Sequence, residues 1–368
     1  MKMRYIAERG FFMVKGTPNL STENLIASYE TVRYDLNMNP LGIPDSVKNV
    51  VSAHIDALSE YPDNNYTELK DSISSYVGAP AGNIIIGSSS YEFIKLLIEF
   101  NSPKKALLIT PGAHNYEKLL KLNGCEIIYY ETKAEDDFVL DIADLISNLS
   151  EELDMVFISN PNGTTSKLID RESMNFICKI CTGNDIFLVV DEEYMDFCAN
   201  WQDETAVPLT NEYDNMIILR NTTKFFAVPG LRLAYAITSN AVFKKTLEIA
   251  GFPYSINRFA ELAGIDMFKD ASYISRSAEV ITTERNLVCS ALSARKSIRL
   301  IRPAANFMLV ELLKPDITAT DVVSHCANRG LYIRSCADMT GLGNKYIRFC
   351  FMNPKQNDLL VNTILEIV

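Results

Sequence analysis

Short apolar runs alternate with segments of helical pattern along the first 240 residues. Strands are predicted at 83–87, 105–110, 126–131, 155–160, 186–194 and 216–220. The segments between them, such as "SYEFIKLLIEF" and "NYEKLLKLNG", carry apolar residues at helical spacing. Continuous apolar strands separated by helices are typical of a mainly parallel sheet that helices cover on both faces. The pattern therefore predicts an α/β fold.

The pattern changes after about residue 240. Two helical segments, "AVFKKTLEIA" and "RFAELAGIDMFKD", precede the β-rich runs "IRPAANFMLVEL" and "KYIRFCF" and a helical C-terminus. This order of elements predicts a second, smaller α+β domain. We expect a large domain at 45–245, a small domain at 246–368, and an N-terminal segment, 1–44, that packs with the small domain.

The composition excludes several classes of protein. The 368 residues carry 35 basic and 46 acidic side chains, a net charge of −11, which argues against a nucleic-acid-binding surface. No apolar run approaches the roughly 20 residues that a membrane-spanning helix needs. The opening stretch "MKMRYIAERGFFMVKG" lacks the pattern of a signal peptide, and the eight cysteines are scattered as in a reducing cytoplasm. A cytoplasmic protein without a membrane partner is expected.

A metal centre is not expected from the sequence. Cys178 and Cys181 form a C-x-x-C pair at the end of a predicted helix, but no second pair completes a zinc site. The three histidines share no ligand spacing. The two cysteines are interpreted as structural residues.

Polar residues gather where the predicted strands end. "GSSS" (87–90) lies between a strand and a helix, "NPNG" (160–163) follows another strand, and Asp191, Thr223, Lys224 and Arg232 follow two more. In a parallel α/β sheet, ligands bind beyond the carboxyl ends of the strands. Lys224 stands between a buried strand and two phenylalanines, and a desolvated ammonium is costly unless it is paired, neutralised or used chemically.

These residue types match the needs of pyridoxal phosphate (PLP). A lysine forms its Schiff base, a carboxylate pairs with its ring nitrogen, and an arginine with hydroxyl groups holds its phosphate at a helix N-terminus. Each feature alone has a simpler explanation, since a serine-rich turn is more often a helix cap and an acidic turn is usually a solvated loop. Their order along one predicted sheet favours the cofactor.

The motifs "EYPDNNYTELKDSISSYVG" (60–78), "VVDEEYMDF" (189–197) and "TKFFAVPGLRLAY" (223–235) resemble those of the fold-type I PLP-dependent enzymes of aminotransferase class I/II. The resemblance covers residues 36–351 and is greatest to the branch that holds histidinol-phosphate aminotransferase and threonine-phosphate decarboxylase. It implies a mainly parallel sheet of the seven-stranded type. The stretch "RSCADMTGLGNKYIR" (334–348) looks more like the decarboxylase.

The resemblance implies a role for each matching residue. Lys224 would bind the cofactor covalently, Asp191 would pair with the ring nitrogen, and Tyr194 would donate to the phenolic oxygen. The expected phosphate ligands are Ser89, Ser90, Thr223 and Arg232, joined by Tyr61 from the neighbouring subunit of a homodimer with shared active sites. Arg348 and Arg334 would hold the carboxylate or phosphate of a small-molecule substrate, and the remaining expected contacts are Asn39 to substrate and Asn162 and His114 to cofactor.

The chain departs from the family pattern at several of these places. Gly163 stands where the family has an asparagine, and the adjacent Asn162 is the candidate substitute. Ala113, beside His114, takes the place of the aromatic residue that stacks on the cofactor ring, and Asn221 replaces a hydroxyl residue. The cradle "GSSS" lacks the glycine usual within this turn, and the histidine–glycine motif of the decarboxylase N-terminus is missing. The departures leave cofactor binding intact and bear on substrate identity.

Three functions follow from these observations. The main prediction is a PLP-dependent aminotransferase acting on a small, phosphorylated amino acid, amine or keto substrate. The alternative is an O-phospho-amino-acid decarboxylase, which "GLGNKYIR" favours and the missing N-terminal motif disfavours. A catalytically silent binding protein is the third, which Gly163 and Ala113 favour. Against it stands the joint retention of Lys224, Asp191 and Tyr194, together with Arg232, because folding does not require that set.

Overall fold

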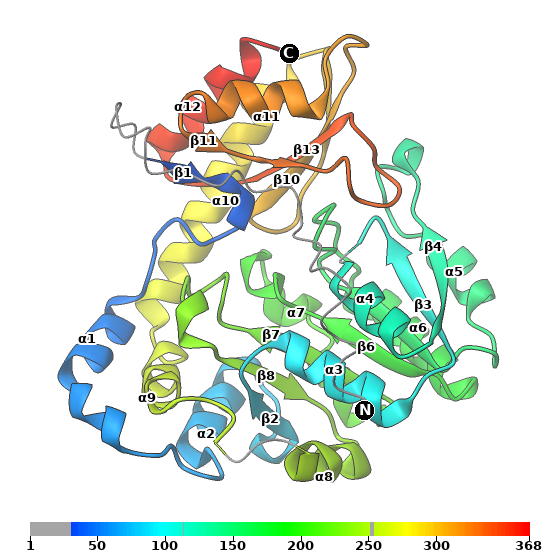
Figure 1. Ribbon diagram of the computed structural model, residues 1–368, viewed down its shortest axis with the longest axis vertical. Helices are drawn as coiled ribbons and strands as arrows, with labels where there is room; N and C mark the ends of the chain where they lie inside the picture. Colours follow the sequence, from blue (N-terminus) through cyan, green and yellow to red (C-terminus); the bar gives the residue numbers. More distant parts are fainter. Residues whose placement is uncertain (1–30, 113, 251–253) are drawn as a thin grey trace, which may run out of the picture.

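The computed structural model describes residues 31–112, 114–250 and 254–368 (Figure 1). Its larger sheet has seven strands in the order β2-β8-β7-β6-β5-β3-β4. Their bounds are β2 (Ile84–Gly87), β3 (Lys105–Thr110), β4 (Glu126–Glu131), β5 (Met155–Ser159), β6 (Phe187–Asp191), β7 (Met216–Asn221) and β8 (Ala234–Ile237). The prediction of a mainly parallel α/β sheet is confirmed.

One strand of this sheet runs against the others. β8 pairs antiparallel with both β2 and β7, whereas β7, β6, β5, β3 and β4 pair in parallel. β8 was not predicted, because its four residues "AYAI" follow directly on a polar stretch with the pattern of a binding loop. A strand that reverses direction here needs only the short connection from β7 and no crossover helix.

Both faces of the sheet are buried, which explains the unbroken apolar runs. Leu188 and Val190 of β6 point into one apolar core, and Val189 between them points into the other. The first core also holds apolar side chains of α2 (Thr67–Val77), α6 (Arg171–Gly183) and α9 (Arg258–Met267), and the second those of α3 (Ser90–Asn101), α4 (His114–Leu122) and α8 (Ala241–Ala250). Cys178 and Cys181 are buried in α6, as core residues.

A second, antiparallel sheet of four strands lies beyond the first (Figure 1). Its order is β12-β13-β10-β9, with β9 (Ile298–Ile301), β10 (Phe307–Leu312), β12 (Arg334–Ser335) and β13 (Tyr346–Cys350). The helices α11 (Ala319–Ala327) and α12 (Pro354–Leu365) pack together beside it. Near the start of the described chain, β1 (Val32–Arg33) pairs in parallel with β11 (Leu331–Tyr332).

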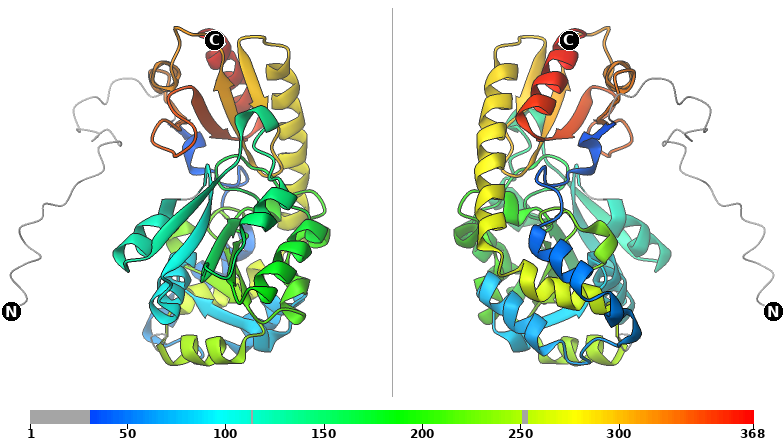
Figure 2. Two further views of the ribbon diagram at one scale, coloured as in Figure 1. Left: turned by 90° about the vertical axis from the view of Figure 1, so that its right-hand side faces the viewer. Right: turned by 90° about the vertical axis from the view of Figure 1, so that its left-hand side faces the viewer.

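The long helix α10 (Ala271–Ser293) runs alongside both sheets, as the side views in Figure 2 show. The remaining helices are α1 (Asp45–Ala53), α5 (Ile142–Asn148) and α7 (Trp201–Glu204). Within the described residues, no helix is both long and apolar enough to cross a membrane. Residues 1–30, which include the opening stretch and much of the predicted segment 1–44, lie outside the described part of the chain. The proposed domain boundaries stay predictions.

Candidate active site

The polar residues singled out in the sequence meet at one edge of the larger sheet. Asp191 ends β6 in register with Ser159, the last residue of β5. Gly87 ends β2 opposite Ala234 of β8, and Asn221 ends β7 opposite the same residue. The loops that follow these strands, with the serines of 88–90, Lys224 and Asp191, therefore start side by side.

Asp191 is a buried carboxylate held by two donors. Its Oδ2 accepts a short hydrogen bond from the Tyr116 hydroxyl, and its Oδ1 accepts one from the Glu193 backbone N–H at 3.1 Å. Burial, with a smaller contribution from the nearby Glu193 carboxylate, raises the pKa of Asp191 to about 7 against the lowering effect of the Tyr116 hydrogen bond. A carboxylate in this state is poised to pair with a cationic ring N–H.

Tyr116 was missed by the sequence analysis. It lies on the first turns of α4, and its ring stacks on Phe157 of β5 with 5.4 Å between centroids. The sequence signal was a tyrosine close after the strand end "TPG", but only the fold brings it to Asp191.

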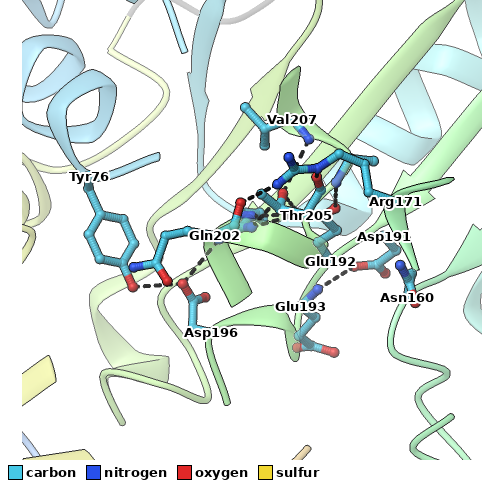
Figure 3. Close-up of polar contacts among 12 residues, drawn as sticks. Tyr76, Asn160, Arg171, Asp191, Glu192, Glu193, Asp196, Gln202, Thr205 and Val207 are labelled. Atoms are coloured by element: carbon cyan, nitrogen blue, oxygen red, sulfur yellow. Dashed lines mark hydrogen bonds and ion pairs between the residues drawn. The ribbon is translucent and has the colours of Figure 1, made fainter. Parts of the chain in front are cut away.

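A buried ion-pair network joins the "DEEY" turn to the neighbouring strand β7 (Figure 3). The fully buried Arg220 of β7 pairs with Glu192 at 2.7 Å and with Asp196 at 3.0 Å. Thr205 and Tyr76 complete the network through hydrogen bonds to Glu192 and Asp196, both at 2.7 Å. Because these charges are paired and desolvated together, the turn that carries Asp191 is held in one position.

Lys224 is half-buried in the loop after β7. Its Nζ donates to the Leu36 carbonyl at 3.1 Å, and no carboxylate among the described residues forms an ion pair with it. Its own carbonyl accepts a hydrogen bond from the Asn39 backbone N–H at 3.0 Å. The backbone of Lys224 is therefore held in place, while its amine has no ion-pair partner among the described residues and can react with a ligand.

The serines of the turn after β2 are partly used by the helix they precede. Ser89 is the N-cap of α3, and its Oγ accepts from the Glu92 backbone N–H at 3.2 Å. Ser90 Oγ accepts from the Asn221 side chain at 3.2 Å, and the Asn221 Oδ1 accepts from the Thr223 backbone N–H at 3.0 Å. Asn221, which replaces a hydroxyl residue of the family pattern, therefore joins the α3 N-terminus to the lysine loop.

Arg232 lies at the end of the same loop, just before β8. Its backbone has the left-handed conformation, with φ +59°, and its exposed side chain donates to the Pro229 carbonyl at 3.4 Å. Within the described part of the chain it forms no ion pair with a carboxylate, and a guanidinium in this state suits a phosphate.

Tyr194 is buried between the two sheets. Its hydroxyl accepts a hydrogen bond from the Asn37 side chain at 3.3 Å, and its ring packs edge-on against Phe307 of β10 at 4.9 Å. Burial raises the pKa of Tyr194, and Glu193 adds to this effect while Arg348 opposes it. Asn37 was not predicted as a site residue.

The two candidate substrate arginines lie opposite each other on neighbouring strands. Arg334 of β12 is in register with Arg348 of β13, so their side chains project from the same face. Arg348 Nη1 donates to the Gly163 carbonyl at 2.6 Å, and its guanidinium lies 5.3 Å from the Phe307 ring centroid. Arg334 pairs with Asp338 at 2.6 Å.

The turn 160–166 is fixed by its own side chains. Asn162 Oδ1 accepts from the Thr164 and Thr165 backbone N–H groups, both at 2.9 Å, and its Nδ2 donates to the Pro111 carbonyl at 3.0 Å. The Asn162 amide is therefore engaged with backbone in this state. At Gly163 a Cβ would meet Ser159 and Tyr194 atoms at 3.6 Å, an ordinary contact, so a side chain would fit there.

Three predicted residues lie in other surroundings. Asn39 is buried, and its Nδ2 donates to the Phe225 carbonyl at 2.7 Å and to Ser277 at 2.8 Å. Tyr61 is 76% exposed and its ring stacks on Tyr254, with 4.5 Å between the ring centroids. His114 is the first residue of α4, but its side chain lies outside the described part of the structure. Ala113 lies outside it too.

Unpartnered polar atoms mark the site as built for a ligand. Among the described residues, Asn37 Oδ1, Asn306 Oδ1 and Arg348 Nε are buried without a hydrogen-bond partner. Asn306 donates to the Asn37 carbonyl at 3.0 Å, which links these atoms to Tyr194. A buried polar group without a partner is costly, so a bound group that supplies the bonds stabilises the site. With Lys224, Asp191 and Arg232, this set of donors and acceptors fits PLP and an anionic substrate.

The fold and this set of residues define a PLP-dependent enzyme of the α/β class. Residues 35–364 match the aminotransferase class I and II family, and the chain belongs to that family. Its members are PLP-dependent, in agreement with the cofactor predicted from the sequence.

Individual relatives carry two different activities in their names. A protein of Caldanaerobacter subterraneus subsp. tengcongensis, provisionally named threonine-phosphate decarboxylase, is 32% identical over 89% of this chain and 88% of its own length. The threonine-phosphate decarboxylase of Salmonella typhimurium is 28% identical over 93% of each chain. The solved histidinol-phosphate aminotransferase of Clostridium acetobutylicum superposes with a TM-score of 0.85 at 30% identity, over 91% of this chain and 98% of its own.

Proposed function

We propose that this chain is a PLP-dependent aminotransferase acting on a small, phosphorylated amino acid, amine or keto substrate. The observation that carries the proposal is the pair Arg334 and Arg348, opposite each other on one face of the smaller sheet, with the buried Arg348 Nε unpartnered. Arg334 pairs with Asp338, whereas Arg348 has no carboxylate partner among the described residues, so this face carries more positive than negative charge. An acidic substrate group beside Arg348 would supply the missing counter-charge, and a phosphate brings more negative charge and more acceptor oxygens than a carboxylate.

The other residues have roles that follow from their contacts. PLP supplies the electron sink that lets a bond at the substrate α-carbon break. Asp191 would hold a proton on the ring nitrogen, because its Oδ atoms already have two neutral donors and its remaining lone pairs accept a cationic N–H. Lys224 would bind the cofactor and then move the proton at the α-carbon. Ser89, Ser90, Thr223 and Arg232 would hold the phosphate.

A second candidate is decarboxylation of an O-phospho-amino acid. The loop between β12 and β13 favours it, since this loop carries the decarboxylase-like sequence and reaches the candidate site: Gly341 approaches Pro111, and Met339 Sδ accepts from Thr164 Oγ1 at 3.8 Å. The names of the two decarboxylase relatives favour it too. If the arginines hold the phosphate and leave the α-carboxylate free to stand perpendicular to the ring, carbon dioxide is lost in place of the proton.

Single-turnover chemistry separates the two reactions. Purified enzyme loaded with PLP is mixed with O-phosphothreonine, O-phosphoserine and histidinol phosphate, with threonine and histidinol as matched substrates lacking phosphate. Formation of the pyridoxamine form of the cofactor supports amino transfer, and release of carbon dioxide with PLP retained supports decarboxylation. Equal reaction of phosphorylated and unphosphorylated partners would contradict the role given to the two arginines.

We also propose a homodimer with shared active sites in the cytoplasm. Tyr61 and Tyr254 present stacked, exposed rings, and Ile55 and Leu58, shortly before Tyr61 in the sequence, are exposed too. An exposed apolar group of this kind is typical of a surface that a partner covers. A second copy placed there by twofold symmetry would bring each Tyr61 to the other chain.

A further inference from the structure

A cavity lies on one side of α10, and none of the described residues that line it belongs to the candidate active site. It has a volume of about 600 Å³ and opens to solvent. Its walls come from α10, from the end of β9, and from the segments that follow the turns 160–166 and 191–197. The apolar part of the lining is Leu168, Ala199, Leu300 and Pro303.

Two arginines give this cavity its charge. Arg285 of α10 is half-buried and donates to the Ala304 and Ala305 carbonyls, and Arg302 lies just beyond β9 with an exposed side chain. No carboxylate belongs to the cavity lining found among the described residues, and no ion pair of either arginine occurs within that part of the chain. Burial lowers the pKa of Arg285, and repulsion by Arg302 contributes to the lowering.

The two arginines lie together in the cavity wall of a protein whose net charge is −11. The half-buried Arg285 and the exposed Arg302 repel each other, and a shared anion turns this repulsion into attraction. Asn286 and Ser290 of α10 also line the cavity and offer neutral hydrogen bonds. The apolar wall opposite them suits a short hydrophobic body attached to the anion.

We propose that this cavity is a binding site for a small organic anion, a phosphate ester or carboxylate with a compact apolar group. Its head group lies between Arg285 and Arg302, and its apolar part lies against Leu168, Leu300 and Pro303. Because the walls belong to α10, to the smaller sheet and to loops that continue from Gly163 and Tyr194, a bound anion ties these parts together. The site is therefore placed to regulate the enzyme from outside its active site.

Binding of phenyl phosphate and of benzoate to the PLP-loaded enzyme tests the proposal, with benzyl alcohol as the neutral control. Titration calorimetry is expected to show one saturable site for at least one of the two anions and none for the alcohol. Arg302→Gln and Arg285→Gln should each weaken that binding about tenfold or more, the loss of one charge-assisted contact. Arg302 is exposed, so its variant folds even if the Arg285 variant does not.

Two variants serve as controls for the position of the ligand. Arg295→Gln removes an exposed charge beyond the C-terminal end of α10, outside the cavity, and Arg348→Gln removes the charge of the candidate substrate site. Both should leave anion binding unchanged. Loss of binding in Arg348→Gln with none in Arg302→Gln would place the anion in the active site and overturn the proposal, as would the absence of saturable binding to the wild type.

Cysteine labelling gives an independent readout of the position. All eight cysteines lie in the described residues; seven are buried and Cys289, in the cavity wall, is half-buried. Iodoacetamide should therefore modify Cys289 first, and saturating phenyl phosphate or benzoate, whichever binds, should slow this modification in the wild type and not in Arg302→Gln. Unchanged labelling in the presence of a bound anion would show that the anion lies elsewhere.

Discussion

The Tyr116 hydroxyl donates a hydrogen bond to the carboxylate of Asp191, and this contact joins α4 to the end of β6. The two residues are far apart in the sequence, and both are buried. The bond stabilises the charged form of a carboxylate whose burial favours the neutral form. Tyr116 thus sets how readily Asp191 keeps a proton on the cofactor ring.

The first prediction concerns pH and the Asp191 carboxylate in the cofactor-free protein. Its pKa is raised from 3.8 to about 7, so the folded chain binds more protons than the unfolded chain between these values. This extra proton stabilises the folded chain at low pH, so the free energy of unfolding decreases as the pH rises from about 4 to 7. Urea unfolding across this range should show the decline, and Asp191→Asn should lack this component.

Tyr116→Phe is the matched variant for this measurement. It keeps the ring that stacks on Phe157 and removes the donor, so the pKa of Asp191 rises and the decline extends to higher pH. A pH profile identical to that of the wild type would show that the hydroxyl does not act on Asp191.

The second prediction is that Lys224 carries the cofactor. The purified protein should be yellow, and borohydride should fix PLP on the peptide that contains Lys224, because among the described residues its Nζ bonds to the Leu36 carbonyl and to no carboxylate. Lys224→Ala should abolish the fixed label, whereas Lys104→Ala, at an exposed position, should not. Mass spectrometry of the digested protein locates the label, and its appearance on another lysine would refute the assignment.

The third prediction tests the shared site. Tyr61→Ala and Lys224→Ala homodimers should each be inactive or nearly so, and mixing them under subunit exchange should restore activity. One site of the mixed dimer then holds both intact residues. The control mixes Lys224→Ala with Asp191→Asn, two residues of the same chain's site, where no wild-type site can form. Failure of the first mixture with verified exchange would exclude a shared site.

The fourth prediction concerns the buried network behind the site. Arg220→Met leaves Glu192 and Asp196 desolvated without their cation, and should lower the free energy of unfolding by about 3–5 kcal/mol. Arg33→Met, which breaks an exposed pair with Asp35, should cost about 1 kcal/mol or less. Chemical denaturation of both variants makes the comparison; similar losses would mean that the buried pairs add nothing specific.

The sheet could be predicted because its signal is local. Runs such as "IFLVV" (186–190) are apolar throughout, since helices cover both of their faces. β8 was missed because four residues flanked by loop residues give too short a pattern. α10 was missed because two of its buried positions, Ser277 and Glu284, are polar and interrupt the apolar spacing. The β-rich runs of the smaller sheet were predicted, but not the pairing of β1 with β11, which joins residues as far apart in the sequence as Val32 and Leu331.

Some residues of the candidate site could be predicted from the sequence, and others could not. Lys224, Asp191 and Arg232 stand out because charged residues directly after apolar strands need a reason. Tyr116, Asn37 and Asn306 could not be predicted as their neighbours, because each reaches the site from an element distant in sequence. Asn162 and Asn39 stay predictions as ligand contacts, and no sequence pattern indicates that their amides bind backbone carbonyls.

The apolar core beneath the larger sheet continues without a break into the smaller one. It contains Leu188 and Ile218 of the first sheet, Phe307 and Ile347 of the second, and Ile281 of α10 between them. Neither sheet can lose its packing without exposing the apolar surface of the other. The two sheets should consequently unfold together in one transition, even though the sequence pattern divides the chain in two. In calorimetry, the heat absorbed per mole of cooperative unit should equal the van't Hoff enthalpy when that unit contains both sheets.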